Sequence, residues 1–188
     1  MARVLQVGLV LLTGWLCLLA NAEAATFKQC QRIPARQSEA VLQVQAVRIL
    51  DGDTLDVLPA QPSGKALPYR VRLAEIDAPE KDQPYGKAAA TVLSDLVNGK
   101  SITLRYRECD RYHRIIGRLT VDNNYIAEVM IQRGAAWFNS QYSDSAELYD
   151  IENQARDAKL GLWSLPKHQI IEPWVWRKLS AEERRKIR

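Results

Sequence analysis

Apolar and polar residues alternate in several short stretches of the first two thirds of the chain, which is the pattern of half-buried β-strands. We expect strands at residues 41–47, 54–58, 69–76, 101–107 and 115–121. A turn at Asp51-Gly52 separates the first two, and a polar turn at residues 122–124 follows the fifth. The first part of the chain is therefore dominated by short strands.

Three later stretches instead repeat their apolar residues with helical spacing, at residues 86–98, 126–132 and 143–159. The last should be the longest helix, with Ser143 as its N-cap and Gly161 just beyond its end. Five short strands and about three helices predict an α+β, mainly β fold, a small five-stranded barrel of the OB-fold type. Residues from 165 onward contain tryptophans and then basic side chains, and we interpret them as a tail.

The N-terminus has the layout of a secretory signal peptide. Arg3 precedes a mostly apolar run at residues 7–20, and the small residues Ala22 and Ala24 follow it. The run is short for a membrane span, although a retained N-terminal anchor is the alternative. We expect residues 1–24 to be removed, which predicts a secreted or periplasmic protein with no membrane segment in its mature form.

Removal of such a signal would also remove Cys17 and would leave Cys30 and Cys109. Exported proteins commonly oxidise their cysteines, so we expect these two to form a disulfide. The alternative is two independent free thiols.

The length of 188 residues suits one compact domain with short extensions. We expect an N-terminal arm at residues 25–40, the barrel domain at 41–164 and the tail at 165–188. The formal net charge of +4 and the pI of about 9.0 weakly favour a polyanionic partner. The basic residues 184–186 should be solvated.

Three clusters of acidic and arginine residues follow one another along the chain, at residues 51–54, 72–80 and 110–114. They supply carboxylates that suit a hard divalent cation, a further carboxylate that could act as a base, and two guanidinium groups. Hydrolysis of a phosphodiester needs this combination, because charge accumulates on the phosphate oxygens during attack by water. Each cluster alone could be a turn or a surface ion pair, whereas the ordered set favours catalysis.

These clusters, together with Tyr85-Gly86 and residues 161–164, resemble the staphylococcal nuclease family over about residues 41–163. The resemblance implies an OB barrel that cleaves DNA and RNA in a Ca²⁺-dependent reaction and leaves 3′-phosphates. It also implies roles for individual residues. Those that match the family's calcium ligands are Asp53, Asp77 and the backbone carbonyl of Ala78. Those that match its catalytic residues are Glu80 as general base and Arg72 and Arg114 as phosphate clamps.

Two tyrosines, Tyr112 and Tyr142, match family positions near the nucleotide. The sequence departs from the family pattern in the short loop between Glu80 and Tyr85 and in His113, which stands where glycine is common. We expect a monomer that prefers single-stranded or denatured nucleic acid. The alternative function is a non-catalytic OB-fold module that binds single strands or a protein.

Overall fold

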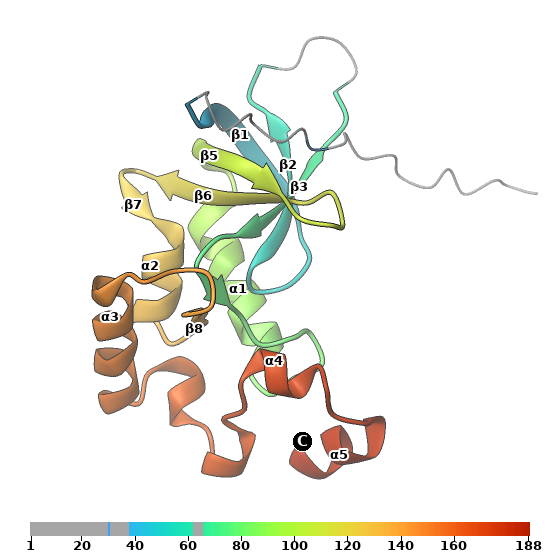
Figure 1. Cartoon of the computed structure of the whole chain (residues 1–188), viewed down its shortest axis with the longest axis vertical. Coiled ribbons are helices and arrows are strands. Elements are labelled where there is room, and N and C mark those ends of the chain that lie inside the picture. The colour runs from blue at the N-terminus through green and yellow to red at the C-terminus, as the bar shows by residue number, and fades with distance from the viewer. Residues whose placement is uncertain (1–29, 31–37, 62–65) are drawn as a thin grey trace, which may run out of the picture.

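The computed structural model describes residue 30, residues 38–61 and residues 66–188 (Figure 1). The expected signal peptide at residues 1–24, and the expected arm apart from residues 30 and 38–40, lie outside the described residues.

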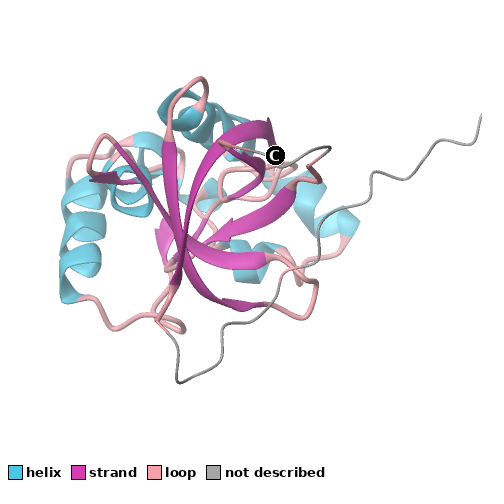
Figure 2. Ribbon diagram, turned by 90° about the horizontal axis from the view of Figure 1, so that it is seen from above, coloured by secondary structure: helices cyan, strands magenta, loops and turns pink. Residues whose placement is uncertain are grey.

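The strands form a closed barrel, which confirms the fold that the sequence predicted (Figure 2). Its five strands are β1 (Ala40–Ile49), β2 (Thr54–Pro59), β3 (Tyr69–Leu73), β5 (Ile102–Cys109) and β6 (Ile115–Val121). Neighbours in the order β3-β2-β1-β5-β6 pair antiparallel, and a parallel pairing of β3 with β6 closes the circle. The two-residue strand β7 (Asn124–Tyr125) folds back and pairs antiparallel with the end of β6.

Alternation along the strands separates the barrel core from the site. On β3, Tyr69, Val71 and Leu73 are buried, whereas Arg70 and Arg72 between them are only partly buried. Because successive side chains point to opposite faces of a strand, Arg72 lies on the face away from the core. Its strand is also paired with β6, so residues just before β6 lie beside β3.

The expected strand at residues 69–76 is interrupted. Glu75 has a φ of +68°, and after it β4 (Ile76–Asp77) leaves the barrel and pairs with β8 (Trp137–Phe138). Positive φ is unusual for a residue with a side chain. This break turns Asp77 out of the line of β3.

The three expected helices are present: α1 (Gly86–Val97) and α2 (Ile126–Gln132) pack against the barrel, and α3 (Ala146–Asp157) packs against α2. The expected N-cap of the third helix was wrong, because Ser145 caps α3 and Ser143 donates a hydrogen bond to Glu75 instead. The expectation that this helix is the longest was also wrong, since α1 and α3 each contain 12 residues.

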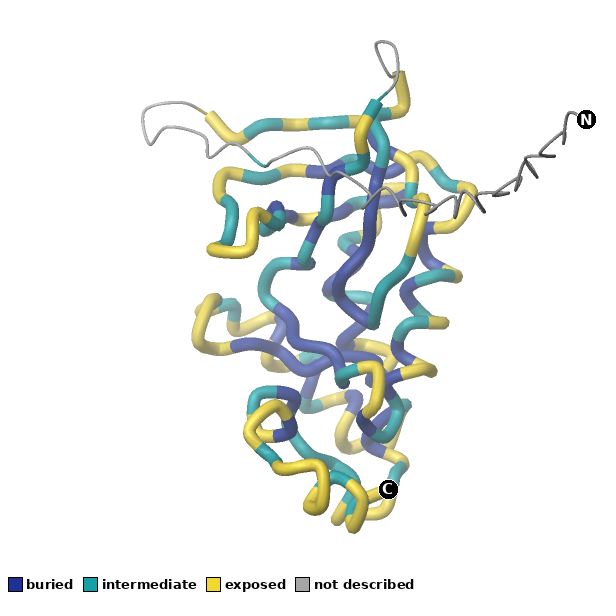
Figure 3. Tube along the Cα trace, turned by 90° about the vertical axis from the view of Figure 1, so that its right-hand side faces the viewer, coloured by how far each residue is buried: buried dark blue, intermediate teal, exposed yellow. Residues whose placement is uncertain are grey.

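The region interpreted as a tail is folded. Residues 165–188, called the C-terminal segment below, contain η2 (Lys167–Gln169), α4 (Pro173–Trp176) and α5 (Ala181–Ile187), and they follow η1 (Gly161–Ser164). Trp176 is fully buried. The segment forms the end of the molecule below α1, at the bottom of both Figure 1 and Figure 3. Among the described residues, no helix is long and apolar enough to span a bilayer.

Candidate active site

The turn between β1 and β2 carries the first of the expected carboxylates. Asp51 accepts the backbone N–H of Asp53 at 3.0 Å, which fixes the turn, and Asp53 itself is 5% exposed. Oδ2 of Asp53 accepts the backbone N–H of Ala78 at 2.7 Å. A Cβ on Gly52 would lie 2.7 Å from that of Ala78, so only glycine allows the turn to pack so closely on this loop.

Arg72 joins this carboxylate to the second one. Its Nε lies 3.1 Å from Oδ1 of Asp53, and its Nη2 lies 2.8 Å from Oδ1 of Asp77. Its Nη1 donates to the carbonyls of Leu73 and Ile76, both at 2.9 Å. With 14% of its side chain exposed, Arg72 is fixed by four contacts. The planar guanidinium can make them at once because its donors point in several directions.

Negative charge is concentrated here. Burial raises the pKa of Asp53 to about 7, against the opposing effect of Arg72, and the nearby charges of Asp51 and Asp77 raise it further. A positive charge at this point would therefore stabilise the ionised carboxylates.

Glu80 lies three residues beyond Asp77 and is connected to it through a residue that the sequence analysis missed. Arg177, just after α4, places its Nη2 2.7 Å from Oδ2 of Asp77 and its Nη1 2.7 Å from Oε1 of Glu80. The same Nη1 donates to Oδ1 of Asp77 at 3.2 Å. The hydrogen bond to Asp77, followed by that to Glu80, raises the pKa of the Arg177 guanidinium above its ordinary value. Below, Asp53, Asp77 and Glu80 are called the acidic cluster.

The chemistry of these groups fits a hard divalent cation. Asp53, in the turn between β1 and β2, and Asp77, at the end of β4, are buried carboxylates, and oxygen is the ligand that Ca²⁺ and Mg²⁺ prefer. Within the described part of the chain, however, no group of three or more histidine, cysteine or acidic side chains is arranged as a metal site. Protein carboxylates alone would thus leave such a cation incompletely ligated. The backbone of Ala78 lies beside Asp53, because its N–H donates to a carboxylate oxygen of that residue.

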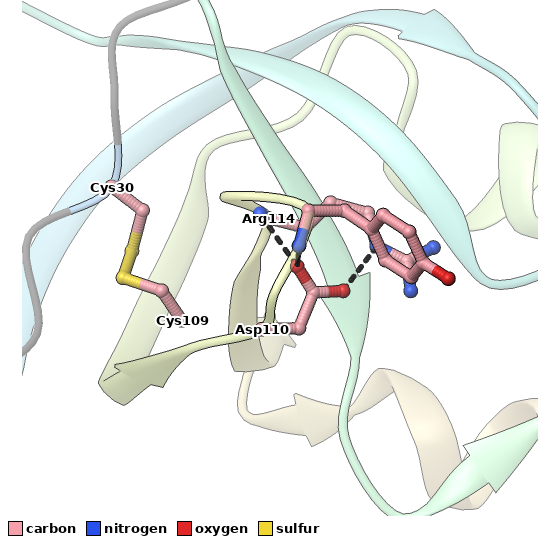
Figure 4. The surroundings of a disulfide bond; sticks show 5 residues. Cys30, Cys109, Asp110 and Arg114 are labelled. Carbon is pink, nitrogen blue, oxygen red and sulfur yellow. Dashed lines mark hydrogen bonds and ion pairs between the residues drawn. A yellow bond between two sulfur atoms is a disulfide. The ribbon is translucent and has the colours of Figure 1, made fainter.

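Arg114 lies immediately before β6, whose first residue, Ile115, is opposite Val71 of β3. Its Nε donates to Oδ2 of Asp110 at 2.6 Å, and its backbone N–H donates to Oδ1 at 2.9 Å (Figure 4). Burial alone would raise the pKa of Asp110, but these bonds and the charge of Arg114 lower it. No hydrogen bond or ion pair of the described residues joins Arg114 to the acidic cluster, so the structure connects Asp53, Asp77, Glu80 and Arg72 but leaves Arg114 apart.

A disulfide between Cys30 and Cys109 lies beside this loop, with the two Cα atoms 6.0 Å apart (Figure 4). It fixes the residue that directly precedes Asp110. Tyr112 and Tyr142, the expected nucleotide contacts, have 61% and 79% of their surface exposed. The ring of Tyr112 lies 5.6 Å from the guanidinium carbon of Arg114. His113 has a φ of +61°, which explains why glycine would suit this position.

Comparison with known proteins adds an independent observation. The family model described as staphylococcal nuclease homologue matches residues 70–165. The chain belongs to this family. An uncharacterized endonuclease of Escherichia coli is 41% identical to this chain over 134 residues, which are 71% of this chain and 83% of the relative. A micrococcal nuclease of Shigella flexneri is 40% identical over 147 residues, which are 72% and 80% of the two chains.

A more distant similarity covers only part of its relative. The staphylococcal-like nuclease CAN1 of Arabidopsis thaliana is 39% identical over 110 residues, which are 58% of this chain and 33% of that protein. Membership makes the protein a nuclease-family hydrolase, for which nucleic acid is the substrate class. The matched residues include Arg72, Asp77, Glu80 and Arg114 but end before Arg177.

Proposed function

We propose that this nuclease is a Ca²⁺-dependent endonuclease that hydrolyses DNA and RNA with little sequence specificity and leaves 3′-phosphates. The observation that carries the proposal is the position of Arg72 between Asp53 and Asp77, with Glu80 joined to Asp77 through Arg177. Two buried carboxylates, a more exposed carboxylate and a fixed guanidinium are thereby gathered in one place.

In this proposal Asp53, Asp77 and the Ala78 carbonyl hold the cation. When bound, Ca²⁺ supplies a Lewis acid that neutralises charge on the phosphate. Glu80, whose side chain is 33% exposed, accepts a proton from the attacking water. A partly exposed carboxylate can reach a solvent molecule that the two buried aspartates cannot.

The two arginines differ in the donors that they can offer to phosphate. Four of the five N–H groups of Arg72 already have partners, which leaves one on Nη2. Among the described contacts, Arg114 uses only its side-chain Nε, on Asp110, so Nη1 and Nη2 remain for a forked contact with a non-bridging oxygen pair. Arg72 therefore orders the carboxylates and adds a single donor, whereas Arg114 provides the fork.

We place the nuclease outside the cytoplasm, in a periplasm or beyond, after removal of residues 1–24. The apolar N-terminal run and the Cys30–Cys109 disulfide support this location, because disulfides persist in oxidising compartments. The exposed rings of Tyr112 and Tyr142 suit stacking on unpaired bases, which supports a preference for single-stranded or denatured substrate. We expect the enzyme to act as a monomer.

The test uses the protein without residues 1–24, denatured DNA or RNA, and either Ca²⁺ or a chelator. Cleavage should require the cation, and products should become substrates for a 3′-phosphatase. Glu80→Gln should reduce the cleavage rate at least about 100-fold, because a general base usually contributes a factor of this size or more. Glu147→Gln, an exposed residue of α3, is the matched control. Tight binding without cleavage under any divalent ion would instead favour a binding module.

A further inference from the structure

Arg177 holds the carboxylate that the proposed cation would need. Its two terminal nitrogens contact both oxygens of Asp77, at 3.2 Å and 2.7 Å, and one of them also contacts Glu80 at 2.7 Å. Arg72 approaches Asp77 from the other side, at 2.8 Å. Both oxygens of Asp77 thus accept hydrogen bonds from a guanidinium.

The C-terminal segment delivers Arg177 to this position. The residue before it, Trp176, is fully buried and donates to Asp82, and Oδ2 of Asp82 also accepts from Arg188 at 2.8 Å. Gln83 donates to the carbonyl of Ile171 at 2.5 Å. These contacts fix the backbone on both sides of Arg177 against the loop that carries Glu80.

The Arg177 side chain is nevertheless less enclosed than that of Arg72. It is 47% exposed, whereas that of Arg72 is 14% exposed and is held by two backbone carbonyls besides its carboxylates. A rotation about its side-chain bonds would release Asp77 and Glu80 without moving Trp176. Of the two guanidiniums on Asp77, Arg177 is the one that can be exchanged.

Charge explains why an exchange should occur. The acidic cluster contains three carboxylates, and Arg72 supplies one balancing charge. Arg177 supplies a second, and it uses the lone pairs of Asp77 that a metal ligand would offer. A divalent cation would compete with the Arg177 guanidinium for these oxygens, because both draw on their lone pairs and the two positive charges repel each other.

We propose that Arg177 competes with the divalent cation for Asp77 and so sets the cation concentration at which the nuclease becomes active. The proposal rests on the proposed cation requirement. Since linkage is reciprocal, the cation weakens the hold of Arg177 by the same factor by which Arg177 weakens cation binding. The segment beyond the family match thus contributes an internal counter-ion that a sufficient supply of Ca²⁺ displaces.

Calorimetric titration with Ca²⁺, without nucleic acid, tests the competition on the protein lacking residues 1–24. We expect Arg177→Gln to bind Ca²⁺ at least tenfold more tightly than the native protein. Lys178→Gln removes the same charge from the neighbouring exposed residue and should leave the affinity unchanged. Arg177→Lys, which keeps a charge but has no fork, should fall between the native protein and Arg177→Gln.

Hydrogen exchange gives a second measurement that does not depend on catalysis. Ca²⁺ should speed exchange of the Arg177 guanidinium N–H groups, which are bonded to Asp77 and Glu80, and should leave exchange at its backbone N–H, bonded to the carbonyl of Pro173, unchanged. If Arg177→Gln bound Ca²⁺ no more tightly than the native protein, while the native protein bound Ca²⁺ and cleaved nucleic acid, the competition alone would be overturned. Absence of Ca²⁺ binding in all four proteins would overturn the cation requirement as well.

Discussion

The indole N–H of Trp176 donates a 3.0 Å hydrogen bond to Oδ1 of Asp82 and so ties the C-terminal segment to the loop that carries Glu80. Arg188 contacts the second oxygen at 2.8 Å, and Arg184 lies 3.4 Å from it. Burial alone would raise the pKa of Asp82, but the Trp176 bond and the two arginine charges hold it below its ordinary range. The expectation that basic residue Arg184 is simply solvated was therefore wrong.

Trp176→Phe should show how much this contact stabilises the segment. The substitution keeps a buried aromatic ring but removes the N–H, and we expect the free energy of unfolding to fall by about 1–2 kcal/mol, because water can partly replace a donor to the half-exposed Asp82. Urea denaturation measures the change. Val175→Ala in the same helix is the control, and a Phe variant no less stable than this control would contradict the contact.

The strands and several residues that gather at the candidate site could be predicted from the sequence because both follow from local patterns. Alternation marked β3, and the residue types in the clusters pointed to Asp53, Asp77 and Arg72, which the structure joins. Long-range contacts decided the rest. Ser143 and Ser145 are equally good caps in sequence, and only the bond from Ser143 to Glu75, 68 residues away, separates them.

Arg177 escaped prediction for the same physical reason. It lies 100 residues after Asp77, outside the matched family region and among other basic residues. A buried tryptophan immediately before it was the one available signal, because a residue next to a fixed anchor has a defined position. Composition alone makes an arginine near the C-terminus a surface residue.

Arg72→Lys should reduce turnover strongly without unfolding the barrel. Lysine keeps a positive charge but cannot contact Asp53 and Asp77 together with two carbonyls, so the carboxylates should lose their fixed arrangement. We expect the activation barrier to rise by about 3 kcal/mol, which is a rate loss of roughly 100-fold. Initial-rate measurements at saturating Ca²⁺ check this.

The matched control for that variant is Arg48→Lys. Arg48 pairs with Asp56 at 2.8 Å on the barrel surface, with 57% of its side chain exposed, so its replacement should change neither rate nor melting temperature. Turnover near the native value in Arg72→Lys would show that the guanidinium does not organise the site.

Reduction of the disulfide should destabilise the protein through its unfolded state. The bridge closes a separation of 79 residues, for which the loop-entropy relation gives about 4–5 kcal/mol. The Cys30→Ser, Cys109→Ser double variant should lose a similar amount of unfolding free energy. Alkylation before reduction, followed by mass spectrometry, checks the pairing. Thiols that are alkylated without a reductant would show that the disulfide does not form.

Asp110→Asn should destabilise the protein in a way that depends on pH. The carboxylate accepts the backbone N–H groups of Tyr112 and Arg114 as well as the Nε of Arg114, and these bonds lower its pKa below the ordinary 3.8. A depressed folded-state pKa contributes stability that is present above the ordinary pKa and is lost as pH falls through the folded value.

We therefore expect Asp110→Asn to cost about 2 kcal/mol at pH 7, and we expect this cost to shrink as pH falls below the ordinary pKa of 3.8 and through the lowered folded-state pKa, where the native carboxyl becomes protonated too. Denaturation at a series of pH values measures the difference. Asp95→Asn, an exposed residue of α1, should show no comparable dependence. Because Arg114 would lose the contact that orients its fork, the same variant should also cleave more slowly at neutral pH. A destabilisation that stayed constant as pH was lowered from 7 to well below the ordinary pKa of 3.8 would mean that Asp110 acts by its shape and not by its charge.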